Sequence, residues 1–232
     1  GDGISLQSCK NITVKNSFVR SWDDSLVVKN YPRGENHNVQ GSTENILFEN
    51  CIVWTDLAQS MEIGYECVGE TLTNVTFKNI TVVHALHKPV ISIHNAHNAQ
   101  ITNILYDGIT IEDASMGGGD AGTNRQLIDI TVAYSGTWSD QNHLLATNPD
   151  GSRKYVELGG VDGVTIKNVT VLSGGNNLSL RFMGSVDTRA GFGNSVHYVK
   201  NVTIENLVIK GVKITSGYEF ITKTYATGIV IK

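Results

Sequence analysis

One seven-residue pattern recurs along the chain and restricts its possible folds more than any other feature. Each copy begins with a turn residue, alternates apolar and polar residues, and ends at Asn or Gly. The copies are KNITVKN (10–16), ENILFEN (44–50), TNVTFKN (73–79), TNILYDG (102–108), DGVTIKN (162–168) and KNVTIEN (200–206). The alternation predicts a strand with one buried face. The closing residue suits a tight bend, because Asn and Gly tolerate left-handed backbone conformations.

The repeating unit contains more than this one strand. A second apolar stretch follows each copy, and a third follows the first three copies as SLVVKN, SMEIGYE and VISIHN. The unit recurs every 29 residues, from Asn45 to Asn74 and from Asn74 to Asn103. Three short strands per repeat predict an all-β fold, a right-handed parallel β-helix (solenoid) of about six coils. The main alternative is a β-sandwich, whose hairpins would not repeat a three-strand unit in this order.

Two segments break the repeat and are expected to be surface loops. The longer interval from Asn11 to Asn45 fits if 31–43 is a loop. Between 113 and 160 only LIDITVAY resembles a strand, and long loops on a regular scaffold are usually functional or disordered. We expect one β-helix domain over 1–232. The start at Gly1, without Met or a signal peptide, suggests a mature fragment or a module of a larger protein.

Composition excludes several classes of partner. The chain of 232 residues has a net charge of −4 and no basic run, which argues against nucleic acid, and no apolar stretch approaches a membrane span. Cys9, Cys51 and Cys67 show no zinc pattern, so we expect buried thiols and at most one disulfide. We expect a monomer without a metal or other cofactor. Acidic Gly-rich loops such as NPDGS leave weak calcium binding open.

Three aspartates are expected to converge. Successive coils of a β-helix lie about 4.8 Å apart, so equivalent residues form columns. DGISLQ echoes DSLVVK one short coil later, which places Asp2 beneath Asp23 and Asp24. Inverting glycoside hydrolysis needs a protonated carboxyl and a carboxylate about 6.5–9.5 Å apart, and repulsion within an acid cluster raises one pKa. The alternative is a bend with two solvated charges.

Column alignment of the third strands adds candidate substrate-binding residues around this patch. Gln59 falls above Asp24, and Ser92 falls above Glu62, while Lys29, Gly64 and His94 share the next column outward. Aromatic rings that stack on sugars are the other candidates. The candidate substrate-binding residues are Gln59, Glu62, Ser92, His94, Lys29, Trp22, Trp54, Tyr65 and Trp138.

The segment GDGISL…SWDDSLVVKN resembles the polygalacturonase/dextranase-like clan of β-helical glycoside hydrolases, families 28 and 49. ILFENCIVWTDLAQSMEIGYE and NSVHYVKNVTIENLVIKG look more like the dextranase and isopullulanase branch than the pectinase branch. By position, the resemblance implies that Asp23 is the general acid and that Asp2 and Asp24 hold the water nucleophile.

Departures from the pectinase pattern favour a neutral glycan. Pectinases have G-H-G where this chain has AQS, so Gln59 replaces the histidine. They also have an R-I-K clamp for the uronate carboxylate, where this chain offers Ser92, Ile93 and His94. Glu62 is expected to point into the substrate groove beside these residues, where its negative charge would repel a polyanionic substrate.

Three functions fit these observations. We favour an inverting glycoside hydrolase that acts on a neutral polysaccharide. The alternative is a non-catalytic carbohydrate-binding β-helix module from a larger polysaccharide-degrading enzyme, in which aromatic and planar polar groups bind the glycan. A structural or adhesin-like β-helix is the third. For the first two we expect a polysaccharide or oligosaccharide partner and a secreted, extracellular protein.

Overall fold

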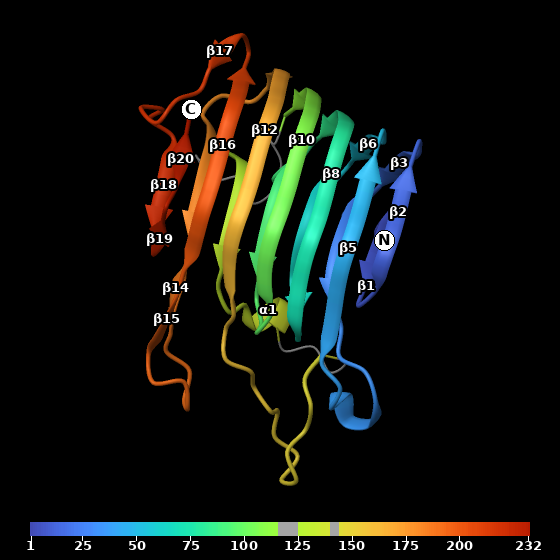
Figure 1. The fold of residues 1–232 in the computed structure, drawn as a ribbon, viewed down its shortest axis with the longest axis vertical. Helices are drawn as coiled ribbons and strands as arrows, with labels where there is room; N and C mark the ends of the chain where they lie inside the picture. The colour runs from blue at the N-terminus through green and yellow to red at the C-terminus, as the bar shows by residue number, and fades with distance from the viewer. Residues whose placement is uncertain (116–124, 140–143) are drawn as a thin grey trace.

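The structure, a computed structural model, describes residues 1–115, 125–139 and 144–232. Within these residues the fold is all-β, apart from the 3-10 turn η1 (Glu35–His37) and the short helix α1 (Gly136–Ser139). Strands run along the long axis of the molecule in two layers, and chain order proceeds from one edge to the other (Figure 1).

The first layer is a seven-stranded sheet in which every pairing is parallel. Neighbouring strands belong to successive repeats, as the columns of the sequence require. In sheet order the strands are β1 (Ile4–Gln7), β4 (Leu26–Asn30), β7 (Met61–Cys67), β9 (Ile91–Asn95), β11 (Arg125–Val132), β13 (Leu178–Met183) and β18 (Ile221–Thr224).

The second layer is an eleven-stranded sheet with a parallel central path. That path consists of β2 (Lys10–Lys15), β5 (Gly41–Glu49), β8 (Gly69–Ala85), β10 (Gln100–Ala114), β12 (Gly160–Gly174) and β16 (Val199–Ile209). The short strands β3 (Phe18–Ser21) and β6 (Ile52–Thr55) extend it at the N-terminal edge, and β17 (Val212–Lys213), β19 (Ala226–Thr227) and β20 (Val230–Ile231) pair with β16. A separate hairpin joins β14 (Ser185–Asp187) to β15 (Ser195–His197).

The predicted repeat is present, with one difference. The first two predicted strands of a repeat merge into one long strand in β8, β10, β12 and β16, because the residue at the bend does not interrupt the pairing. β11 is the strand predicted inside the 113–160 interruption, and 31–40 connects β4 to β5 outside the sheets. The all-β fold with parallel sheets is compatible with a parallel β-helix. The number of coils and the single-domain organisation stay predictions.

The recurring Asn residues lie where the chain needs left-handed backbone. Asn45, Asn74 and Asn103 have φ values of 59°, 57° and 53°. Their side chains also form a ladder between repeats, since the Asn103 Nδ2 donates to the Asn74 Oδ1 (2.6 Å) and the Asn74 Nδ2 donates to the Asn45 Oδ1 (2.9 Å). Each Asn therefore shapes the bend of its own repeat and ties it to the next.

Replacing Asn74 separates these two contributions. Asn74→Ala is expected to destabilise the protein by about 1–3 kcal/mol, because Ala is strained in the left-handed region and cannot join the ladder. Asn74→Gly retains the backbone freedom and loses only the ladder, so its loss should be smaller. Urea unfolding of both variants measures the difference. Equal losses for Ala and Gly would show that backbone strain is not the cause.

The core lies between the two sheets. Phe48, Phe77 and Tyr106 stack across three successive repeats, with ring centroids 5.0 and 4.8 Å apart and nearly parallel planes. Cys51 and Cys67 are buried, Cys9 is partly buried and all three thiols are free, as the sequence predicts. In the described residues no helix has the length and apolar character needed to cross a membrane.

Candidate active site

Asp2, Asp23 and Asp24 meet at the N-terminal ends of β1 and β4. One carboxylate oxygen from each lies within 4.8 Å of the others, with Asp24 buried and the other two more exposed. Backbone hydrogen bonds fix the two segments, since the Gly3 N–H donates to the Asp24 carbonyl (2.7 Å) and the Asp23 N–H donates to the Gly1 carbonyl (3.3 Å). The acid cluster expected from the sequence columns is thus present. In the part of the chain that the structure describes, it is the one group of acids spaced for a shared cation.

The acid cluster opens into a pocket of about 290 Å³. We call this the acid pocket, and it has a mixed polar and apolar wall. Its lining consists of Asp2, Asp23, Asp24, Lys29, Leu57, Ala58, Gln59, Tyr65, Glu66 and Lys88.

Asp24 has an unusual environment for a carboxyl. Burial, and then the negative charge of Glu62, raise its pKa to about 8, against the opposing effects of Lys29 and the Gln59 N–H. The Gln59 N–H donates to the Asp24 Oδ1 (3.1 Å), and the Asp24 N–H donates to the Asp23 Oδ1 (3.0 Å). Asp24 therefore carries a proton at neutral pH, directly beside two more exposed carboxyls.

Lys29 of β4 also lines the acid pocket and pairs with two acids. Its Nζ is 3.1 Å from Glu66 and 3.5 Å from Asp2. Burial alone would lower the pKa of Lys29, but the charges of Glu66 and Asp2 outweigh burial and raise it. Lys29 is thus a permanent cation that balances part of the pocket's negative charge.

A bulge in β7 shapes the pocket beside Lys29. Val28 pairs with Ile63 and Asn30 pairs with Cys67, so three residues of β7 face the single residue Lys29 in β4. Gly64 permits this geometry, since its φ is +124° and a Cβ there would collide with the His94 carbonyl oxygen. Bulges redirect side chains next to functional sites, and this one brings Tyr65 and Glu66 into the pocket wall.

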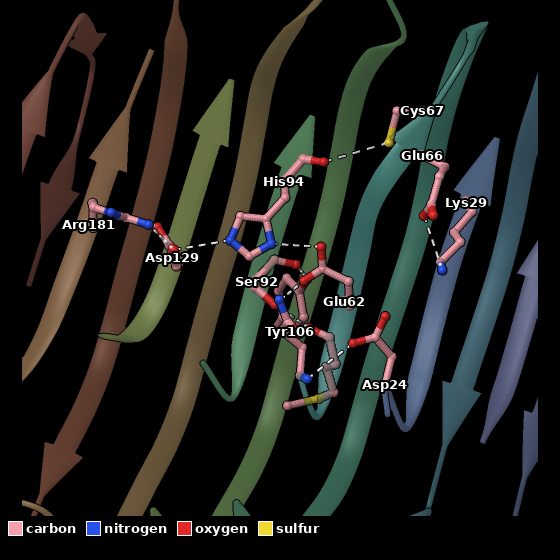
Figure 2. Close-up of polar contacts among 12 residues, drawn as sticks. Asp24, Lys29, Glu62, Glu66, Cys67, Ser92, His94, Tyr106, Asp129 and Arg181 are labelled. Atoms are coloured by element: carbon pink, nitrogen blue, oxygen red, sulfur yellow. Dashed lines mark hydrogen bonds and ion pairs between the residues drawn. The ribbon is translucent and has the colours of Figure 1, made fainter. Parts of the chain in front are cut away.

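A row of charged side chains, buried except for the partly exposed Arg181, crosses the same sheet from β7 through β9 and β11 to β13 (Figure 2). The His94 Nδ1 lies 2.8 Å from the Glu62 Oε1, and its Nε2 lies 3.0 Å from the Asp129 Oδ2. Arg181 donates two hydrogen bonds to Asp129, of 2.7 and 2.5 Å, and Ser92 donates to Glu62. We call Glu62, His94, Asp129 and Arg181 the charged row.

Contacts within the charged row set the protonation states of His94 and Asp129. Burial alone would lower the pKa of His94, but the charge of Glu62 and the hydrogen bond to Asp129 raise it to about 10. Burial alone would raise the pKa of Asp129, but the hydrogen bond and charge of His94, followed by Arg181, lower it to about 2. At neutral pH His94 is therefore an imidazolium that donates from both nitrogens, to Glu62 and to the ionised Asp129.

Three sequence candidates do not contact the pocket directly. Glu62 and Ser92 are fully buried, and His94 is 2% exposed. The column alignment was correct for Val27, Glu62 and Ser92, and Gly64 pairs with His94 as expected. It was wrong for Lys29, which does not pair with Gly64 because the β7 bulge shifts the register there. The expectation that Glu62 projects into the groove needs correction, because its carboxylate is turned toward Ser92 and His94 and its charge is paired there.

The aromatic candidates differ in their distance from the acid pocket, and only one of those described lines it. Tyr65 lines the acid pocket, whereas Trp22 and Trp54 are absent from its lining. Trp22 is exposed at the bend after β3. Trp54 lies between the Arg20 guanidinium (5.0 Å from its ring centroid) and the His84 ring, and its indole N–H donates to Asp56. Neither tryptophan therefore lies at the acid pocket. Trp138 belongs to α1, and its side chain lies outside the described part.

Sequence reasoning missed Glu66 and Lys88 in the pocket, and Asp129 and Arg181 in the charged row. Gly64 inside a strand pattern was an available signal, because an isolated Gly in a strand suggests a bulge. The lone acid in LIDITVAY was another, because an Asp within a buried strand needs a partner.

Comparison with known proteins gives one weak match. A scan against protein-family models finds no match. Over 166 aligned residues, 65% of this chain, the sequence is 27% identical to a probable endopolygalacturonase D of Neosartorya fischeri. The chain spans only 32% of the length of that protein. This similarity supports the polygalacturonase-like clan and gives no support to the dextranase and isopullulanase branch.

Proposed function

We propose that the protein is a glycoside hydrolase whose acid–base groups are Asp2, Asp23 and Asp24. The observation that carries this proposal is the convergence of these carboxyls in one pocket, with Asp24 protonated at neutral pH beside more exposed neighbours. A hydrolase needs both a protonated and an ionised carboxyl at the same pH, and burial of one member of a cluster provides that. The weak similarity to a probable endopolygalacturonase supports the same reaction class.

The cluster starts and ends the reaction with the same number of protons. The adjacent pair Asp23 and Asp24 holds one proton, which passes to the leaving oxygen as the glycosidic bond breaks. An ionised carboxylate takes a proton from the attacking water, whose oxygen bonds to the anomeric carbon. As the resemblance implies, Asp23 transfers the proton, and it is more exposed than Asp24 and so better able to reach a glycan.

We propose inversion of configuration, which the family resemblance implies. The spacing in the cluster points the other way, since oxygens within 4.8 Å are closer than the roughly 6.5–9.5 Å usual for inverting pairs. Proton NMR of the first product resolves this point, because it shows whether the α or β anomer forms first. Retention would exclude the water-first reaction and require a glycosyl–enzyme intermediate.

A neutral polysaccharide is the proposed substrate, as in the dextranase-like branch. Arg181 is committed to Asp129 by two hydrogen bonds, and Lys29 is paired with Glu66 and Asp2. The charges of these two cations are thus neutralised by acids of the protein and are not available to a uronate carboxylate. Because polysaccharides are too large to enter a cell, we also propose that the protein acts after secretion.

Incubation with a glycan panel tests the proposal. Dextran, pullulan, xylan, glucomannan and polygalacturonate are each assayed for reducing-end release and for binding. We expect release from one of the four neutral glycans. Release from polygalacturonate alone would overturn the neutral substrate and retain the hydrolase. Binding without release would support the carbohydrate-binding module instead.

A further inference from the structure

Tyr65 lies flat against His94 at the edge of the acid pocket. The two ring centroids are 4.3 Å apart and the planes differ by 6°. Since both nitrogens of His94 are bonded to carboxylates, the ring is an imidazolium, and a cation against an aromatic face is stabilising by about 0.5–2 kcal/mol. The stacking gives the Tyr65 ring one preferred plane in the pocket wall.

The orientation of His94 is itself fixed at both ends. Glu62 holds Nδ1, Asp129 holds Nε2, and Arg181 holds Asp129 in turn, as the dashed lines of Figure 2 trace. His94 is 2% exposed, and neither ring nitrogen is available to a ligand or a proton acceptor. His94 therefore has no direct part in proton transfer, although it lies next to the acid pocket.

The β7 bulge fixes the backbone of Tyr65. The β7 bulge begins at Gly64, where any side chain would meet the His94 carbonyl, and it ends with Glu66 paired to Lys29 at 3.1 Å. The residue after Tyr65, Glu66, is thus paired to Lys29 in β4, and the Tyr65 ring itself stacks on His94 in β9. Tyr65 is partly exposed, yet contacts on two neighbouring strands fix its position. We infer that the position of its ring serves the pocket and not only the packing of the sheet.

We propose that Tyr65 is a glycan-binding residue beside the acid cluster and that His94 is a positioning residue that sets the plane of its ring. An aromatic ring in a fixed plane presents a flat apolar face to the C–H groups of a sugar at little entropic cost. The charged row thereby acts on substrate binding from a buried position. The expected effect on KM rests on the proposed hydrolysis. The expected effect on glycan binding does not require turnover.

Affinity electrophoresis in gels containing each of the five glycans of the panel measures this binding without turnover. Tyr65→Leu and His94→Gln are each expected to weaken retention about tenfold, and Tyr65→Phe should stay within about twofold because the ring is kept. His84→Gln is the matched control, since His84 also bonds an aspartate, Asp113 at 2.7 Å, and contacts an aromatic ring, but lies outside the acid pocket. This control should bind like the wild type.

Kinetics on a hydrolysed glycan supply the second readout. Both Tyr65→Leu and His94→Gln should raise KM about tenfold and leave kcat within about threefold, a pattern that a merely structural defect would not give. If His94→Gln does not fold, Glu62→Gln replaces it in the binding measurement, because it keeps the shape of the partner that holds Nδ1.

Two results would overturn the inference. Wild-type retention by Tyr65→Leu would show that the ring does not contact glycan. Weakened retention by Tyr65→Leu together with wild-type retention by a folded His94→Gln would remove the positioning role. If the wild type binds glycan but releases no product, the hydrolase proposal fails, and the binding results still decide the roles of Tyr65 and His94.

Discussion

Asp24→Asn is expected to abolish hydrolysis and, at pH 7, to make the protein more stable. Asp24 has a pKa of about 8 because it is buried near Glu62, whereas an unfolded Asp titrates near 3.8. Between these values the folded state keeps a proton that the unfolded state has lost. Wild-type stability therefore falls as pH rises from about 4 to about 8 on account of this group.

Asn removes this penalty, because it is neutral in both states and can still accept the Gln59 N–H. The gain at pH 7 should be about 2–4 kcal/mol, and the decline of stability between pH 4 and 8 should become shallower. Urea unfolding across this pH range measures both quantities. Asp23→Asn is the matched comparison, being the same change on the neighbouring, less buried side chain. A less stable Asp24→Asn protein at pH 7 would contradict the assignment of a proton to Asp24.

Asp129→Ala is expected to be among the most destabilising changes in the site. It leaves the buried His94 imidazolium without one partner and Arg181 without its two hydrogen bonds. Breaking a buried ion pair from one side costs about 3–5 kcal/mol. Because the pKa of Asp129 is lowered to about 2, its contribution is present above about pH 4 and is lost as pH falls through about 2.

Urea unfolding at pH 7 tests this expectation, and a second Arg–Asp pair serves as control. Asp56 accepts hydrogen bonds from Arg20 (3.1 Å) and the Trp54 indole (2.9 Å), but on the surface. Asp56→Ala should change the unfolding free energy far less than Asp129→Ala, because solvent screens an exposed pair. Similar losses for the two variants would show that burial of the charged row contributes no special stability.

Repeat spacing alone predicted much of this arrangement. A period of 29 residues aligns Asn45, Asn74 and Asn103 on parallel strands, which explains the Asn ladder. The shorter step of 21 residues from Asp2 to Asp23 predicts the approach of Asp2 to Asp23 and Asp24. Counting fails where a strand gains residues. The bulge at Gly64 adds two residues to β7 relative to β4, and this brings Glu66 to Lys29.

Repeat spacing also does not predict whether a side chain in an aligned column is buried or which residue pairs with it. Glu62 occupies the outward position that the alignment gave it, yet it is buried, and its charge is paired with His94. The second partner of His94, Asp129, comes from β11, a strand inside the segment that interrupts the repeat. Long-range ion pairs of this kind depend on the register of the folded sheet, which a single sequence does not specify.

The most direct test of the central claim is the rate of reducing-end release by the wild type and by Asp23→Asn on the glycan that the protein binds best. If the acid cluster is catalytic, release by Asp23→Asn falls by about a thousandfold or more, while retention in affinity gels stays within about twofold. Equal release by the two proteins, or binding by the wild type with no release at all, would contradict the hydrolase.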